Sequence, residues 1–294
     1  MPGFVRDASF ALLRPGVLVS AFIGLVLAMA GAFAGEPKPL YLSIVPRLSA
    51  TVTHRDWSPF VDRLARDIHQ PVELRVFNTF EEFDRFAASA RADLLFVNPY
   101  QQVMLRRKRG FIPLVRDGSK QLSGILVVRS DDPIKSLREL DGKQLAFPHP
   151  NAFGASLYMR ALLEREHGVH FTPQYVTTHG NVFRNVILGN VAAGGGINVT
   201  LNQEPPAVRE QLRVLYETPP VAPHPLVANP QVPAALREKI IASVLNMNSD
   251  DAGRLILKQV TLTQPMRADY TRDYQPLERL NLDKYYIDTD VQEP

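Results

Sequence analysis

The fold is decided by residues 123–163, SGILVVRSDDPIKSLRELDGKQLAFPHPNAFGASLYMRALL. Within this stretch, the compact apolar run at residues 125–129 is bounded by turn-forming residues and predicts a strand. A second strand is predicted at residues 144–147, where Pro148 and Pro150 end it. A short helix is expected between the strands, at residues 136–140. A longer helix is predicted to run from Asn151, its N-cap, to about residue 166. Strand and helix therefore alternate as they do in α/β sheets.

The start of the longer helix is the first candidate ligand site. Its first residues are small or contribute free backbone N–H groups: Ala152, Phe153, Gly154 and Ala155. The first N–H groups of a helix have no partner within the helix, and they favour a bound anion. We therefore expect a ligand where this helix leaves the sheet.

The first half of the chain repeats the alternation of strand and helix. Residues 93–97 (DLLFV) are continuously apolar after Asp93, which predicts a strand inside a largely parallel sheet. Ser58 followed by Pro59 predicts the start of the first helix, after a polar loop. In open α/β sheets ligands bind beyond the carboxyl ends of the strands. The strand tips at which we expect ligand contacts are residues 47–53, 78–79 and 98–100.

Two patterns in the second half are unusual. Residues 218–233 contain six prolines, too many for a helix or a central strand, and we predict a return crossing between two lobes there. Gly194, Gly195 and Gly196 are not followed by the lysine of a phosphate-binding loop, which excludes a P-loop. We interpret these glycines as a flexible strand end that the other lobe or the ligand approaches closely.

The N-terminal segment has the pattern of an export signal. Arg6 and Arg14 precede an apolar run at residues 17–30, and an A-x-A cleavage motif ends at Ala34. A transmembrane anchor is the alternative, but the run is shorter than the roughly 20 residues that span a bilayer. We expect residues 1–34 to be a cleaved signal peptide.

Composition narrows the function. The 294 residues carry a formal net charge of +3 and include no cysteine. Without cysteine there are no disulfides, no thiolate metal sites and no lipidated cysteine to tether an exported protein. We therefore expect an unlipidated periplasmic protein. The small and dispersed charge argues against nucleic-acid binding.

Histidines invite a metal hypothesis, because His149, His179 and His224 are expected near one cleft. They lack a tight spacing such as H-x-x-x-H, so we expect neither a metal nor another cofactor. No nucleophile–base pair and no paired carboxylates converge on the cleft, and the G-x-S-x-G pattern that begins at Gly154 is incomplete. The chain is therefore not expected to be an enzyme.

Three segments follow one another in a recognisable order: SGILVVRSDDPIKSLRELDGKQLAFPHPNAFGASL, THGNVFRNVILGNVAAGGG and TPPVAPHPLVANPQVPAALREKI. From about residue 41 to residue 286, the chain resembles the phosphate/phosphonate-type periplasmic binding proteins, the substrate-binding components of ABC importers. The resemblance implies a type II binding-protein fold. In this fold two α/β lobes, each a mostly parallel sheet flanked by helices, are joined by two crossover segments and close on a ligand. We expect residues 35–121 with 222–294 to form lobe 1, and residues 122–221 to form lobe 2.

The resemblance also implies ligand contacts in lobe 2. In phosphonate binders the loop at the helix start carries a Ser-Thr-Ser-Gly sequence that holds the phosphonate. The matching residues here are Ala152, Phe153, Gly154 and Ala155, so the amides remain and the three hydroxyls are absent. His149 stands where an aspartate is common. Phe153 either covers an apolar part of the ligand or docks against the opposite lobe.

Further contacts implied by the resemblance come from both lobes. His179 matches a histidine that the family uses at the ligand. Asn198 lies near the position of the family's acidic residue and is neutral. Thr79, Asn98 and Tyr100 occupy the corresponding strand tips of the first lobe.

The expected function is capture of a small oxyanion, phosphonate-like or phosphate-like, by a monomeric periplasmic solute-binding protein that serves an ABC permease. The alternative is a ligand-sensing periplasmic partner of a membrane histidine kinase, with a ligand other than phosphonate. Neither role involves chemistry on the ligand.

Overall fold

The computed structural model describes Met1, Gly3, residues 38–89 and residues 91–287. Apart from Met1 and Gly3, the predicted signal peptide lies outside the described residues. Within the described part, no helix combines the length and apolarity needed to cross a membrane.

The first lobe is built on a six-stranded sheet of order β11-β4-β10-β3-β1-β2. Its strands are β1 (Leu40–Ile44), β2 (Val72–Arg75), β3 (Leu94–Phe96), β4 (Ile112–Asp117), β10 (Pro225–Ala228) and β11 (Pro265–Arg267). β1 pairs in parallel with β2 and β3, whereas β10 is antiparallel to both β3 and β4 and β11 is antiparallel to β4. β1 to β4 thus run in one direction. β3 is fully buried inside the sheet, as its apolar run predicts.

Helices cover both faces of this sheet because its strands are apolar on both sides. Leu94 and Phe96 face a core formed with α2 (Ala50–Ile68), α9 (Ala234–Asn246) and α10 (Asp251–Gln259). Leu95 faces a second core, formed with α3 (Phe80–Ala88) and α4 (Pro99–Arg109). The remaining elements of this lobe are short: η3 (Met247–Ser249), α11 (Tyr270–Asp273), η4 (Gln275–Leu280) and η5 (Asp283–Tyr285).

The second lobe is built on a five-stranded sheet of order β7-β6-β8-β5-β9. Its strands are β5 (Gly124–Arg129), β6 (Gln144–Phe147), β7 (Thr172–Tyr175), β8 (Ala193–Ile197) and β9 (Leu212–Glu217). β6 is parallel to β7 and β8, and β5 is antiparallel to β8 and β9. The other elements of this lobe are η1 (Leu137–Leu140), η2 (Phe153–Leu157), α5 (Tyr158–Arg165), α6 (His179–Ile187), α7 (Asn198–Gln203) and α8 (Pro206–Arg209).

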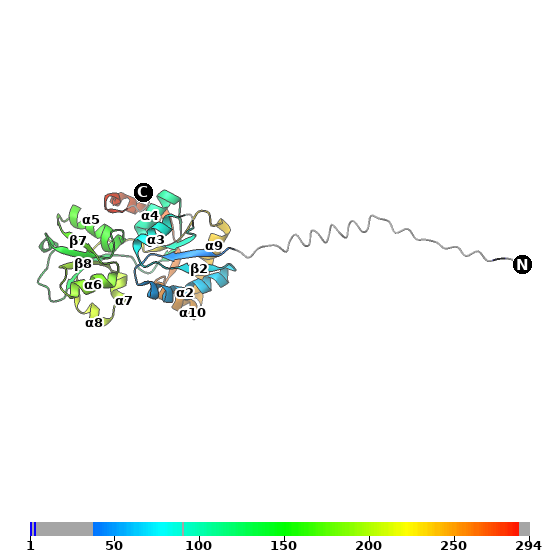
Figure 1. The fold of residues 1–294 in the computed structure, drawn as a ribbon, viewed down its shortest axis with the longest axis horizontal. Helices are drawn as coiled ribbons and strands as arrows, with labels where there is room; N and C mark the ends of the chain where they lie inside the picture. The colour runs from blue at the N-terminus through cyan, green and yellow to red at the C-terminus, as the bar shows by residue number, and fades with distance from the viewer. Residues whose placement is uncertain (2, 4–37, 90, 288–294) are drawn as a thin grey trace. The chain divides into compact units, whose positions relative to one another are not determined.

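Alternating residues of β5 separate the two faces of this second sheet. Leu126 and Val128 share a core with α5, whereas Ile125 and Val127 share one with α6. Figure 1 shows α5 and α6 on either side of β7 and β8. The lobe boundaries expected at residues 121/122 and 221/222 stay a prediction.

The start of the first helix differs from its prediction. α2 begins at Ala50, where the side chain of Ser49 accepts a hydrogen bond from the Val52 N–H at 3.4 Å. Pro59 lies inside the helix. The helix tolerates the lost N–H because Trp57 and Phe60 bury their side chains against the sheet. Arg47 therefore lies just before a helix cap, not in a long loop.

The proline-rich segment also differs, because it contains the central strand β10. Pro225 is the first residue of that strand, a position that proline tolerates. The three following residues are not proline and complete a strand that is buried throughout. The other prolines of the segment flank the strand, so the proline content does not exclude it.

The triple glycine is a buried central strand, not a flexible end. A Cβ added at Gly195 would lie 1.9 Å from the carbonyl oxygen of Ala155. One added at Gly194 would lie 2.5 Å from the side chain of Val182. The predicted close approach is therefore real, but α6 and the Phe153–Leu157 segment of the same lobe make it.

Candidate functional site

A small cavity joins side chains of the first lobe to the helix start of the second. Its walls are formed by Val45, Arg47, Phe80, Asn98, Ala152, Phe153, Gly154, Ala155, His179, Ile197 and His224. The free volume is about 10 Å³, close to the space that one water molecule needs. Six of the nine predicted ligand-binding residues thus line one cavity: Asn98, Ala152, Phe153, Gly154, Ala155 and His179.

The backbone at the cavity is wound as a π-helix. The N–H groups of Ser156 and Leu157 both donate to the carbonyl oxygen of Ala152, at 2.8 and 3.0 Å. Across the described residues, no protein acceptor pairs with the N–H groups of Phe153, Gly154 and Ala155. These N–H groups stand at the start of a helical run that continues into α5, and they suit an anion.

The predicted cap of this helix is wrong. Asn151 does not cap it, and Ala152 occupies the N-cap position without a side-chain hydrogen bond. The Asn151 side chain donates instead to Asp84 Oδ2 at 3.1 Å and accepts from the Ile287 N–H at 2.8 Å. Contacts outside the second lobe thus replace the local cap.

Arg47 supplies a buried positive charge. Its side chain follows β1 and is 8% exposed, and its Nε has no hydrogen-bond partner in the described structure. Nη2 lies 3.5 Å from Thr261 Oγ1, and the guanidinium carbon lies 5.4 Å from the centre of the Phe96 ring. Burial lowers the pKa of Arg47 to about 10, so the group stays charged at neutral pH. A buried charge without a partner is unfavourable, and an anion would relieve it.

His179 is buried beside this charge. The Thr200 hydroxyl donates to the carbonyl oxygen of Ile197 at 3.0 Å, so its oxygen can accept from the Nδ1–H of His179 at 3.2 Å. Nε2 is then the ring nitrogen left for a ligand. Burial, with a further contribution from the Arg47 charge, lowers the pKa of His179 to about 3. The neutral ring would accept an O–H from a partly protonated oxyanion, and would donate only after taking up a proton.

His224 completes the cationic and imidazole side of the cavity. It stacks on Phe96 with the ring centres 5.7 Å apart, and it is 7% exposed. Burial and then the charge of Arg47, with a smaller contribution from His179, hold the pKa of His224 well below its usual value.

Three predicted residues do not line the cavity. Thr79 caps α3, where its hydroxyl oxygen accepts from the Glu82 N–H at 3.2 Å. The Tyr100 hydroxyl donates to Asp283 at 3.0 Å. Asn198 lines a larger neighbouring cavity.

Phe153 docks against the first lobe. Its ring lies parallel to that of Tyr100, with the centres 6.2 Å apart. Its other neighbour is Tyr158, at 5.5 Å. Of the two roles left open by the sequence, the structure shows docking, although Phe153 also reaches the cavity wall.

Sequence reasoning missed Arg47 and gave His224 only a metal role. Arg47 lies within a strand tip where ligand contacts were expected, but its burial depends on α2 beginning at residue 50. His224 reaches the cavity through β10, which the prolines obscured. Among the described residues, no three His, Asp or Glu side chains form a group that could hold a metal ion.

Polar contacts close the lobes beside the cavity. Asn98 Nδ2 donates to the Asn151 carbonyl oxygen at 3.0 Å. His149 stacks on Phe80 with ring centres 4.6 Å apart, and its Nε2 lies 3.0 Å from Glu81 Oε1. Burial lowers the pKa of His149 although Glu81 acts against that shift. These contacts hold the helix start of the second lobe against α3 and α4 of the first.

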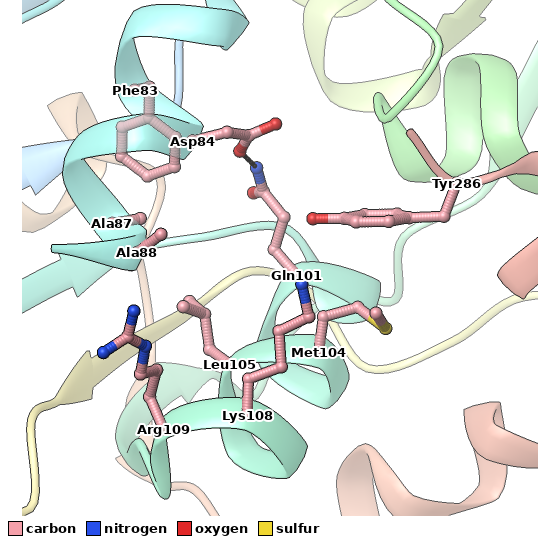
Figure 2. A pocket seen from close by; sticks show the side chains of 10 residues that line it. All are labelled: Phe83, Asp84, Ala87, Ala88, Gln101, Met104, Leu105, Lys108, Arg109 and Tyr286. Carbon is pink, nitrogen blue, oxygen red and sulfur yellow. Dashed lines mark hydrogen bonds between the residues drawn. The ribbon is translucent and has the colours of Figure 1, made fainter. Parts of the chain in front are cut away.

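A separate pocket of about 30 Å³ lies between α3 and α4 (Figure 2). Gln101 Nε2 donates to Asp84 Oδ1 at 2.7 Å in its wall, and the ring of Tyr286 lies at its edge. None of the predicted ligand-binding residues lines it. Asp84 in the wall of this pocket also accepts a hydrogen bond from the Asn151 side chain. The pocket therefore adjoins the contact that closes the lobes and is separate from the ligand cavity.

Comparison with solved structures shows the same two-lobed type II binding-protein fold. PhnD1 from Prochlorococcus marinus, in complex with methylphosphonate, matches with a TM-score of 0.77 and 17% identity over 86% of this chain and 100% of that one. A binding protein component of an ABC phosphonate transporter from Pseudomonas aeruginosa matches with a TM-score of 0.75 and 12% identity over 88% of this chain and 91% of that one. XAC2383 from Xanthomonas citri, bound to chloride ion, matches with a TM-score of 0.72 and 18% identity over 84% of this chain and 98% of that one.

A family model supplies the assignment that structural likeness at such low identity does not. Residues 42–274 match the model described as "ABC transporter, phosphonate, periplasmic substrate-binding protein". The match covers well over half of the 294 residues. The chain therefore belongs to the phosphonate-type family of periplasmic substrate-binding proteins of ABC transporters.

Proposed function

We propose that this protein captures a small oxyanion, phosphonate-like or phosphate-like, between its lobes and delivers it to an ABC permease. The observation that carries this function is the buried guanidinium of Arg47, which has no carboxylate partner in the described structure and lines the same cavity as three unpartnered N–H groups. Fixed donors and a buried cation recognise the several oxygens of a tetrahedral anion together.

The amides and Arg47 would replace the hydroxyl groups that Ala152, Phe153 and Gly154 lack. Asn98 would contribute little to the orientation of the anion, because its side chain already forms hydrogen bonds with the Gln101 N–H and the Asn151 carbonyl oxygen. The small cavity has room for about one water, so an oxyanion at Arg47 also occupies space beyond it or binds before the lobes close fully.

Membership in a transporter family favours import over sensing. A sensor-kinase partner would use the same capture step, so the site alone does not separate the two roles. We propose that the protein acts without chemistry on its ligand, as an unlipidated periplasmic monomer released from residues 1–34.

A thermal-shift screen tests the ligand class. Phosphate, phosphite, methylphosphonate, sulfate, arsenite and several carboxylates are added separately to the purified protein. A ligand that binds only the native state raises the melting temperature, by several degrees at about 100-fold excess over Kd. At least one phosphorus oxyanion is expected to do so. A shift with carboxylates alone, or with none of these anions, would contradict the proposal.

Replacing His179 with alanine is expected to weaken binding of that phosphorus oxyanion about 10-fold or more, because a hydrogen bond to a charged group is lost. Calorimetric titration measures the affinity, and circular dichroism checks that the fold is kept. His179→Asn is the matched variant, since its amide can keep the contact of Nδ1 with Thr200 but cannot reach as far as Nε2. Wild-type affinity in both variants would show that His179 does not bind the ligand.

A further inference from the structure

A second and larger cavity adjoins the first. Its volume is about 370 Å³, within the range of sites for small organic ligands. Arg47 and His224 line both cavities. We call this second cavity the side chamber. An oxyanion held by Arg47 therefore has room on the side-chamber side that the small cavity does not offer.

Positive charge dominates the wall of the side chamber. Lys120 and Lys258 line it together with Arg47. Both lysines are exposed, and no carboxylate forms an ion pair with either of them in the described part of the chain. A ligand group that enters the chamber thus meets two lysine ammonium groups that protein carboxylates do not neutralise.

The carboxylate of Asp117 is the one acidic group that lines the side chamber among the described residues, and it is occupied. It accepts from the Ser119 N–H and hydroxyl at 2.8 and 2.6 Å. It also accepts from the N–H groups of Lys120 and Gln264, at 3.1 and 2.9 Å. Four donors use the oxygen lone pairs of this buried carboxylate, so little acceptor capacity remains for a ligand ammonium.

The remaining polar wall is neutral. Asn202 and Gln203 of α7 contribute amides, and Thr261 and Thr263 contribute hydroxyls. Such groups bond carboxylate or hydroxyl oxygens without imposing a charge of their own. Leu122 and Pro223 add apolar contact for a short carbon chain.

Resting on the oxyanion function proposed above, we propose that the ligand is an organic phosphorus oxyanion whose tail carries a carboxylate. The tetrahedral head lies at Arg47 and the helix start, and the tail extends into the side chamber toward Lys120 and Lys258. An aminoalkyl tail is disfavoured, because it would place a third ammonium beside two others without a free carboxylate. A free inorganic anion has no tail, so the side chamber would then be filled by water.

Calorimetric titration with three phosphonates of similar size tests this selectivity: phosphonopropionate, propylphosphonate and aminoethylphosphonate. Phosphonopropionate is expected to bind about 10-fold tighter than propylphosphonate, the sum of two modest charge contacts, with aminoethylphosphonate weakest. The preference should shrink as salt is raised, because the lysines are exposed.

The double variant Lys120→Gln/Lys258→Gln locates the preference. It is expected to remove the advantage of phosphonopropionate and to leave the affinity for propylphosphonate within about twofold. The pair Lys135→Gln/Lys143→Gln, at two exposed positions outside both cavities, is the charge-matched control and should keep the preference.

Failure of this inference is distinguishable from failure of the function on which it rests. Binding of propylphosphonate without any gain from the carboxylate, or a preference that survives in the chamber variant, overturns the carboxylate tail alone. Binding of none of the three phosphonates, together with no thermal shift from any phosphorus oxyanion, overturns both. The same head on a phosphate ester is tested with phosphoglycolate, and its binding would extend the head group to phosphate.

Discussion

Replacing Arg47 with methionine is expected to weaken binding of the phosphorus oxyanion by about 100-fold or more. Removing one partner of a buried charge pair typically costs about 2–5 kcal/mol, and Arg47 lines both the small cavity and the side chamber. The same substitution is expected to raise the melting temperature of the ligand-free protein, because it removes a buried charge whose Nε has no partner. Opposite effects on affinity and on ligand-free stability identify a group that the fold holds for a ligand.

Calorimetry and thermal denaturation without ligand measure the two effects. Arg47→Lys keeps the charge but loses the planar fork, and should bind with intermediate affinity. Arg75, which lies over the Tyr41 ring at 3.9 Å and lines neither cavity, is the control, and Arg75→Met should leave binding unchanged. Wild-type affinity in Arg47→Met would show that Arg47 does not bind the anion. A less stable ligand-free protein would show that the Arg47 charge supports the fold and is not held for a ligand alone.

Gly195→Ala is expected to destabilise the second lobe by about 3 kcal/mol or more, at or beyond the upper end of overpacking substitutions. The added Cβ would lie 1.9 Å from the carbonyl oxygen of Ala155 and 2.6 Å from the Phe147 ring. Both neighbours are fully buried, so neither can move aside. Because Ala155 belongs to the helix start at the cavity, molecules that still fold should also bind the anion more weakly.

Urea unfolding measures this destabilisation, with Gly180→Ala as the matched control. A Cβ at Gly180 meets only the ends of the Arg184 and Glu204 side chains, at 3.1 and 3.2 Å. Gly180 lies in the first turn of α6, where alanine is tolerated better than glycine, so its stability should stay the same or rise slightly. Equal midpoints for the two variants would mean that the strand can shift away from the helix start.

Local patterns predicted the parts of the fold that local forces determine. The strand expected at residues 144–147 is β6 as observed, and the run at residues 93–97 contains the buried β3. Bounded apolar runs identify such strands because their side chains must be buried on both faces of the sheet. The order of three recognisable segments also predicted the family, which the family model shows.

The site was harder to predict because its features depend on distant partners. Asn151 is a good cap residue by type, yet Asp84 and Ile287 engage its side chain. Arg47 looks like an ordinary loop arginine until Ser49 begins the helix that buries it. No periodicity reveals a buried charge without a partner, because that state is defined by the groups around it.

The most direct test of the oxyanion site is a crystal structure of the protein grown with methylphosphonate. The expected result is a phosphonate whose oxygens lie about 3 Å from the Arg47 guanidinium and from the N–H groups of Phe153, Gly154 and Ala155. Its methyl group should point into the side chamber. A phosphonate bound elsewhere, with Arg47 Nε still unpartnered, would contradict the account.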